Sequence, residues 1–334
     1  MKNIARIVVS FLVAALFLWL ALREVSLEEV RLTLNAMSFS WVLPYTFFAL
    51  LSNYIRAERW KQLLDQDGVK AKRVTIFSAV MLGYLVNYAV PRLGEISRSV
   101  YAGNKENISR SKVMGTVITE RILDMAVMFF LFVFVVLFFL RDPSMLGSVL
   151  GDETIGFIQG LWSLDALLLL LVLLASAFLG MWLLRHLFRL VEHIAPSLTV
   201  FKRFAVDTSR KFLSGILSIK EIKNWPMFLV FTVAIWLCYI LMAYIPFTAF
   251  GMHETYQLGL KEATIITVVS AIGVAVPSPG GMGTYHWFVS RSLFVFFAVP
   301  EAMGIAYAIV SHFAMMMIVL LFTPLILVVN KYYK

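Results

Sequence analysis

The chain has 334 residues, of which 60% are hydrophobic and only 15% are charged, and its mean hydropathy is +0.84. A soluble protein of this length cannot cover so much apolar surface, so the composition excludes that class and predicts an all-α polytopic membrane protein. The net charge of +9 is not taken as a sign of nucleic-acid binding, because Lys and Arg of membrane proteins collect in cytoplasmic loops.

Long apolar segments run through the chain, and we expect about six of them to be full spans of one integral membrane domain covering residues 1–334. The first carries Lys2 and Arg6 before its apolar stretch, as a signal peptide does, but its length and the lack of a small-x-small site predict an uncleaved span. The segments cover residues 4–22, 41–56, 74–90, 122–140, 164–184, 226–250, 263–298 (interrupted) and 302–329.

The connections differ sharply in charge, and this difference predicts the topology. Lys and Arg are concentrated in 56–73, which includes Arg56 and Arg59, and in 185–225, whereas 141–163 is acidic. The positive-inside rule then places both termini and both basic segments in the cytoplasm, with the protein in the cytoplasmic (inner) membrane. Segment 185–225 also fits an interfacial helix on anionic lipid, and an ordinary cytoplasmic loop remains the alternative.

Parity of the crossings predicts two re-entrant hairpins. Segments 56–73 and 92–112 are both basic yet are separated by a single apolar segment, so residues 74–112 are expected to enter from the cytoplasm, break at Pro91 and return. The interrupted segment 263–298 is expected to enter from the outside and to break at 277–281. Irregular backbone at membrane depth needs protein or a water-filled cavity around it.

Two similar strings mark these breaks, "AVPRLGE" (89–95) and "AVPSPGG" (275–281). Broken segments of opposite orientation are the sequence pointer to a transport site at an inverted repeat, although two Pro-kinked spans with unrelated loops would give the same strings. The expected tip residues are Asn87, Pro91, Gly94, Pro277, Pro279, Gly280, Gly281 and Gly283.

Charged residues cluster after the first break and at the start of the following span. Arg92, Glu95 and Arg98 recur every three residues, and Glu120 and Asp124 lie one helical turn apart beside Arg121. Because charges inside a bilayer need partners or water, we expect Arg92 or Arg98 to pair with Glu120 or Asp124. The cluster predicts a cavity that binds an anionic group such as lipid phosphate; a purely structural ion-pair network, or cytoplasmic loop charge, is the alternative.

The second break is followed by "TYHWFVSR", which carries His286 and Arg291. We interpret His286 as a proton carrier or headgroup contact and Arg291 as a partner for a buried acid, against the alternative of a tight turn with an interfacial aromatic belt. His and Cys spacing predicts no metal site, and no HExxH, P-loop or nucleophile-elbow pattern occurs, so neither a cofactor nor catalysis is expected.

The string N-x-x-x-P-R-L-G-E-x-x-R (87–98), then E-R-x-x-D (120–124) and P-S-P-G-G-M-G (277–283), resembles the lysylphosphatidylglycerol synthase transmembrane-region family, also described as flippase-like membrane proteins. The resemblance covers essentially the whole chain. It differs at His286, where many members carry Glu shortly after the PGG turn.

The resemblance implies translocation of a phosphate-bearing lipid between leaflets rather than lipid synthesis, because "VVNKYYK" directly after a span leaves no soluble synthase domain to be expected. The expected partners are therefore membrane lipids, phospholipids or other phosphate-bearing lipids. The alternative is an integral-membrane scaffold for a lipid-modifying enzyme or glycosyltransferase, and both a partner enzyme and a homo-oligomer remain open.

Overall fold

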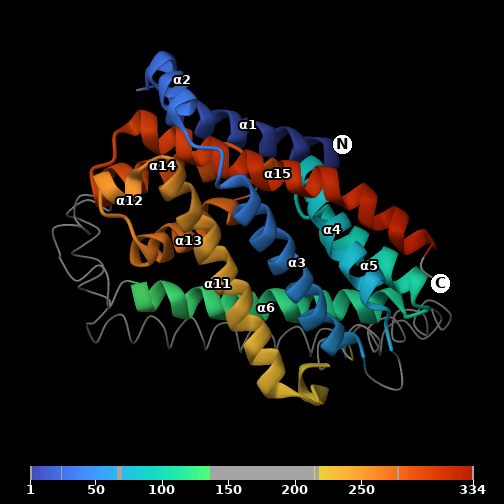
Figure 1. Ribbon diagram of the computed structural model, residues 1–334. Helices are drawn as coiled ribbons and strands as arrows, with labels where there is room; N and C mark the ends of the chain where they lie inside the picture. Colours follow the sequence, from blue (N-terminus) through green and yellow to red (C-terminus); the bar gives the residue numbers. More distant parts are fainter. Residues whose placement is uncertain are drawn as a thin grey trace, which may run out of the picture. The chain divides into compact units, whose positions relative to one another are not determined.

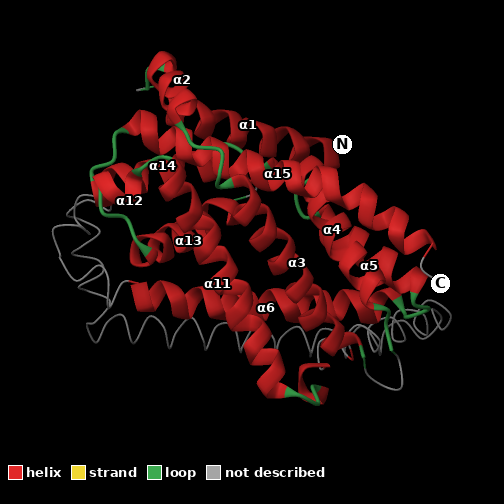
Figure 2. Cartoon of the chain, in the orientation of Figure 1, coloured by secondary structure: helices red, strands yellow, loops and turns green. Residues whose placement is uncertain are grey.

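The computed structural model describes residues 2–23, 25–65, 70–135, 214, 218–276 and 278–332, and these contain helices but no strand (Figures 1 and 2). The all-helical class predicted from composition is confirmed for this part of the chain. The elements are α1 (Lys2–Leu22), α2 (Leu27–Ala36), α3 (Val42–Leu64), α4 (Arg73–Ala89), α5 (Leu93–Lys105), α6 (Arg110–Phe134), η2 (Ser218–Glu221), α11 (Trp225–Ala249), α12 (Met252–Thr255), α13 (Leu260–Ala275), η3 (Pro279–Gly281), α14 (Thr284–Phe297) and α15 (Glu301–Tyr332).

Two described helices, α11 and α15, are long and apolar enough by length and composition to cross a membrane, with mean hydropathies of 2.4 and 2.5 over their most apolar windows. The bent pair α1–α2, which turns by 83°, would make a third if it counts as one span. The number of spans and their orientation remain predictions.

Helices α4 and α5 form an antiparallel hairpin, seen side by side in Figure 1. Near its tip, the Asn87 side-chain oxygen accepts a hydrogen bond from the Gly94 backbone N–H at 2.7 Å. At its open end, the Lys72 backbone N–H donates to the Glu106 carboxylate at 3.0 Å. The turn spans residues 90–92 around Pro91, and Arg92 takes the left-handed conformation with φ +65°. The predicted break at this proline is confirmed, whereas its depth in the membrane remains a prediction.

Helices α13 and α14 form a second antiparallel hairpin around η3, because Gly273 of α13 lies against the backbone of Tyr285 in α14. Three glycines of the turn adopt positive φ angles, which a side chain would make strained. Pro277 lies outside the described residues, but Pro279 begins η3 as expected. The predicted break is therefore confirmed. The three glycines are Gly280, Gly281 and Gly283.

The tips of the two hairpins touch each other. Gly280 of the second tip packs on the ring of Tyr88 at the end of α4, and a Cβ atom at Gly280 would overlap that ring. On the other side of the same turn, the His312 ring of α15 donates from Nε2 to the Gly280 carbonyl at 2.9 Å. The two breaks, nearly 190 residues apart in sequence, thus form one structural region.

Three boundaries differ from the sequence prediction. Helix α3 continues to Leu64, so Arg56 and Arg59 belong to a helix packed along α11 and are not loop residues, which corrects the predicted loop 56–73. Helix α5 occupies most of 92–112, and α6 begins at Arg110, well before the predicted start at 122. The reason is burial: Trp60 and Leu63, which follow the two arginines, are fully buried, and this holds the polar end of α3 in helix.

Some predicted segments lie outside the described residues. They are the acidic loop 141–163, the span 164–184 and the basic segment 185–225 up to residue 217 except for Ser214.

Candidate functional site

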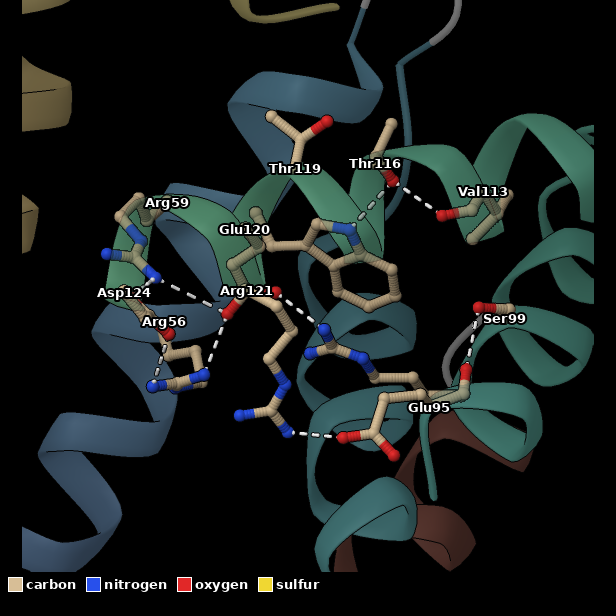
Figure 3. Close-up of polar contacts among 12 residues, drawn as sticks. Arg56, Arg59, Glu95, Ser99, Val113, Thr116, Thr119, Glu120, Arg121 and Asp124 are labelled. Atoms are coloured by element: carbon tan, nitrogen blue, oxygen red, sulfur yellow. Dashed lines mark hydrogen bonds and ion pairs between the residues drawn. The ribbon is translucent and has the colours of Figure 1, made fainter. Parts of the chain in front are cut away.

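The carboxylate of Glu120 on α6 is the centre of a buried ion cluster, shown in Figure 3. Its Oε1 accepts from Arg56 Nη1 at 2.9 Å and lies 3.4 Å from Arg59 Nη2, both on α3. Its Oε2 accepts from Arg98 Nη2 of α5 at 2.8 Å. Glu120 and Arg59 are completely buried, and the other two arginines are nearly so. One carboxylate therefore joins three helices of the first half of the chain.

Asp124 extends the cluster by one turn of α6. Its carboxylate lies 2.6 Å from Arg59 Nη2 and 3.0 Å from Arg56 Nη2. The spacing of four on α6 and of three on α3 puts each pair on one helix face, so two acids meet two arginines across one helix interface. The predicted pairing of Arg98 with Glu120 is confirmed.

An aromatic ring supports the cluster. The guanidinium carbon of Arg98 lies 4.7 Å from the centre of the Trp60 ring, within the range of a cation–π contact. Trp60 Nε1 donates to the Thr116 hydroxyl of α6 at 3.0 Å. Trp60 is fully buried, and its hydrogen bond to Thr116 fixes the position of its ring. The ring in turn supports the guanidinium of Arg98.

A second ion pair, Arg121–Glu95, is the accessible part of the cluster (Figure 3). Arg121 Nη2 of α6 lies 2.6 Å from Glu95 Oε1 of α5, and the two side chains are 40% and 22% exposed. Only this hydrogen bond of the Arg121 guanidinium is formed with described residues, and its Nε lacks a partner. Arg121 therefore has free donor capacity for a ligand.

The cluster carries an excess of positive charge. It contains the four arginines and three carboxylates just described, which leaves a formal excess of +1. The guanidinium Nε atoms of these arginines are buried and form no hydrogen bond with described residues. A buried surplus of donors and positive charge favours an anionic ligand with several acceptor oxygens, as phosphate has.

A cavity of about 340 Å³ opens where the two hairpin tips meet, next to Arg121. Its size is at the lower end of the roughly 300–1,000 Å³ that ligand pockets occupy. Its lining joins α3, α4, α6, α11, α13, η3, α14 and α15, so it lies between the halves of the described chain. Six aromatic side chains contribute to it: Tyr45, Tyr84, Tyr88, Trp236, Tyr239 and Tyr285.

A polar network fixes the second tip beside this cavity. His286 Nδ1 accepts from the Gly283 backbone N–H at 3.2 Å and caps the first turn of α14. The His286 and His312 rings lie 4.9 Å apart, and Tyr285 and Ser311 share a 2.9 Å hydrogen bond. His286 thus holds the turn, and His312, which was not predicted, lines the cavity.

The structure separates the remaining predicted residues from the cluster. Arg92 is exposed at the first tip and does not line the cavity. Arg291 of α14 pairs with Glu301 of α15 at 3.0 Å, and both side chains are partly exposed, so its partner is not the buried acid that was expected. No group of His, Cys, Asp and Glu suited to a metal ion occurs among the residues that the structure describes.

Sequence reasoning missed Arg56 and Arg59, which it counted as loop charge. The available signal was the pair Glu120 and Asp124 in one turn of an apolar helix. Two acids there need more than one cation, and two arginines three residues apart stand at the end of segment 41–56 and just after it.

Comparisons with known proteins agree on a family. A sequence profile described as "Lysylphosphatidylglycerol synthase TM region" matches residues 7–322. The UPF0104 membrane protein MJ1595 of Methanocaldococcus jannaschii is 23% identical over 328 residues, which cover 93% of this chain and 90% of that protein. The UPF0104 membrane protein PH1989 of Pyrococcus horikoshii is 25% identical over 324 residues, covering 92% and 90%. No solved structure matches the chain. Because the profile spans nearly the whole sequence, the chain belongs to the lysylphosphatidylglycerol synthase transmembrane-region family of membrane proteins.

Proposed function

We propose that the protein moves a lipid with an anionic, phosphate-containing headgroup between the leaflets of the cytoplasmic membrane. The family is one of membrane proteins of lipid metabolism, and flipping is our extension of that. The observation that carries the proposal is the cavity between the two hairpin tips, which has Arg121 as its permanently charged lining residue.

Arg121 supports phosphate binding at this cavity. A guanidinium presents a planar fork of N–H donors that matches two phosphate oxygens, and Arg121 uses one of its donors on Glu95. The acyl chains would remain in the bilayer while the headgroup occupies the cavity. The lining is mostly apolar and aromatic, with a few polar groups, as is usual for small-molecule sites.

The Glu95–Arg121 pair couples binding to the hairpin. A phosphate that binds Arg121 competes with Glu95, and Glu95 belongs to α5, whereas Arg121 belongs to α6. Loss of this pair would free one attachment of the first hairpin, whose Tyr88 contacts the second tip at Gly280. A ligand shifts a conformational equilibrium only by binding one state better than the other, and exchange of Glu95 for phosphate supplies such a difference.

The Glu120 cluster has a different role in this proposal. Its ion pairs are buried and connect α3, α5 and α6, so they hold these helices together while the accessible pair changes. The predicted substrate-binding set thus divides into a fixed part around Glu120 and Asp124 and an exchangeable part at Glu95 and Arg121.

Transbilayer movement tests the proposal directly. The purified protein is reconstituted into phosphatidylcholine vesicles that contain phosphatidylglycerol with a fluorescent acyl chain, and dithionite then bleaches only the outer leaflet. We expect the bleached fraction to rise above that of protein-free vesicles for wild type, and to fall back to it for Arg121→Gln and Glu95→Gln.

Arg92→Ala is the matched control, because it removes an arginine of the same region that does not line the cavity. We expect this variant to keep movement. Movement that survives Arg121→Gln in a folded protein would refute the proposed role of the cavity. The alternative of a scaffold predicts no movement in any variant, and retention of a partner enzyme on the membrane.

A further inference from the structure

We infer that a groove between α3, α4 and α15 holds an acyl chain of an anionic phospholipid of the cytoplasmic leaflet, whose phosphate binds Arg73. The groove is formed by α3 from Phe47 to Tyr54, by Phe77 of α4, and by Phe322 and Ile326 of α15. This lipid stays bound and is not the one that is moved, so the inference goes beyond the proposed function and does not rest on it.

The groove is an apolar hollow of about 360 Å³ on the surface of the helices. The Tyr54 hydroxyl is the one polar side-chain group among the described residues that line it. Phe47 and Tyr54 are 60% and 42% exposed, so the groove is open to the surroundings. It shares no lining residue with the cavity at the hairpin tips and is therefore a separate site.

The length of the groove suits an acyl chain. Phe47, Leu50 and Tyr54 recur every three or four residues, so they lie on one face of α3. At the rise of an α-helix this stretch covers about 10 Å. One leaflet contributes about 15 Å to the hydrocarbon core of a membrane. A chain that lies along α3 thus contacts the groove over most of its depth in the leaflet.

A guanidinium lies at one end of the groove. Glu58 follows Tyr54 by one helical turn on α3, and Arg73 precedes Phe77 by one turn on α4. The rings of Tyr54 and Phe77 are 5.8 Å apart, and Arg73 Nε donates to the Glu58 carboxylate at 3.0 Å. The Arg73 side chain is 70% exposed, and its two Nη groups form no hydrogen bond with described residues. Arg73 therefore has donors left for a phosphate.

Positive charge predominates around this end of the groove. The Thr75 hydroxyl of α4 donates to the Asn330 side chain of α15 at 3.3 Å, so the end of α15 belongs to the same region. Lys61 and Asp65 pair with each other. Two further acids are present, because Glu106 accepts from the Lys72 backbone and Glu58 pairs with Arg73. The exposed cations are Lys70, Lys72, Arg73 and Lys331. Four cations against these two acids leave a formal excess of +2.

The combination of an apolar groove and a cationic end identifies the occupant. The predicted topology places this end in the cytoplasm, and anionic lipids of the cytoplasmic leaflet are attracted to cations close to the membrane surface. A second copy of the chain is disfavoured. Two copies in one membrane share an orientation, so their cationic ends would meet at the same surface and repel each other.

Photolabelling locates the bound lipid. The purified protein is reconstituted into phosphatidylcholine vesicles with a trace of either phosphatidylglycerol or phosphatidylcholine that carries a diazirine in its acyl chain. After illumination, mass spectrometry measures the labelling of the groove residues relative to the exposed face of α11 around Val233 and Leu237, which reports ordinary lipid contact. We expect this ratio to exceed one for phosphatidylglycerol and to be lower for phosphatidylcholine.

Variants at the cationic end test the role of charge. We expect Arg73→Gln to lower the ratio for phosphatidylglycerol about five-fold, the contribution of one cation near an anionic lipid. Because Arg73→Gln also leaves Glu58 without its partner, Lys72→Gln repeats the test without breaking an ion pair between described side chains. Arg110→Gln is the matched control: it removes an exposed arginine at the start of α6, which does not line the groove.

A bulky side chain tests the groove itself. Leu51→Trp fills it, whereas Leu321→Trp adds the same ring to an exposed position of α15 outside it. We expect only Leu51→Trp to reduce groove labelling by both lipids. Labelling no higher than that of α11, or equal ratios for the two lipids that neither charge variant changes, would overturn the inference. So would an unlabelled groove in a protein that is dimeric as wild type and monomeric as Leu51→Trp, because a second copy would then cover it.

The labelling experiment is independent of the proposed function. It measures where a lipid binds and needs no movement between leaflets, so absence of movement in the dithionite assay leaves this inference in place. Conversely, an unlabelled groove leaves the cavity at the hairpin tips and its Arg121 unaffected, because the two sites share no lining residue.

Discussion

Replacing Glu120 by Gln is expected to destabilise the protein strongly, because it keeps the shape of the side chain and removes its charge. Arg98 then loses the carboxylate it pairs with at 2.8 Å, whereas Arg56 and Arg59 keep Asp124. Removing one partner of a buried ion pair costs about 3–5 kcal/mol. For a large domain, about 2 °C of melting temperature is lost per kcal/mol, so we expect a decrease of about 6–10 °C.

The measurement is the apparent melting temperature in detergent micelles, followed by tryptophan fluorescence at one heating rate because membrane proteins often unfold irreversibly. Glu95→Gln is the control: it removes a carboxylate from the partly exposed pair with Arg121, for which about 0–1 kcal/mol is expected. The double variant Arg98→Met with Glu120→Gln should recover part of the loss, because it leaves no unpaired Arg98. A melting temperature of Glu120→Gln equal to that of wild type would refute the reasoning that this carboxylate holds three helices together.

Three further predictions concern the hairpins. Gly94→Ala places a methyl group into the backbone of Gly83 across the α4–α5 hairpin. We expect the free energy of unfolding to fall by about 1–3 kcal/mol, measured as a lower melting temperature. An unchanged melting temperature would mean that the two helices separate freely. Gly280→Ala adds a side chain at φ +58° against the Tyr88 ring. We expect this variant to reduce lipid movement in the dithionite assay. We also expect a lower melting temperature, because the left-handed conformation costs a residue with a side chain about 1–2 kcal/mol. His312→Phe removes the donor to the Gly280 carbonyl and should cost about 1–3 kcal/mol; His312→Gln, which can still donate, should lose less, and equal losses would contradict the hydrogen-bond argument.

The sequence predicted the helical membrane class and both breaks because these depend on local chemistry. Proline and glycine interrupt a helix wherever they occur, and the apolar content of a segment reflects the solvent that surrounds it. The pairing of Arg98 with Glu120 was also within reach, since a buried acid needs a cation and Arg98 is one of the two arginines that closely follow the first break.

The sequence misplaced Arg56 and Arg59 for a physical reason. The positive-inside rule counts cations near the ends of apolar segments, and it has no information about carboxylates more than 60 residues away that neutralise them. Buried in α3 beside Trp60, these arginines serve an interface between helices.

Local chemistry therefore determined by itself that this protein is helical, membrane-embedded and broken at two similar turns. Tertiary packing alone decided that Tyr88 meets Gly280, that a cavity forms at this contact, and that Arg121, of the arginines in the region, faces it. The physical reason is that a charged side chain acts through its neighbours in space: a guanidinium beside Glu120 joins helices, whereas the guanidinium of Arg121, which is partly exposed, is the one we propose to bind a ligand.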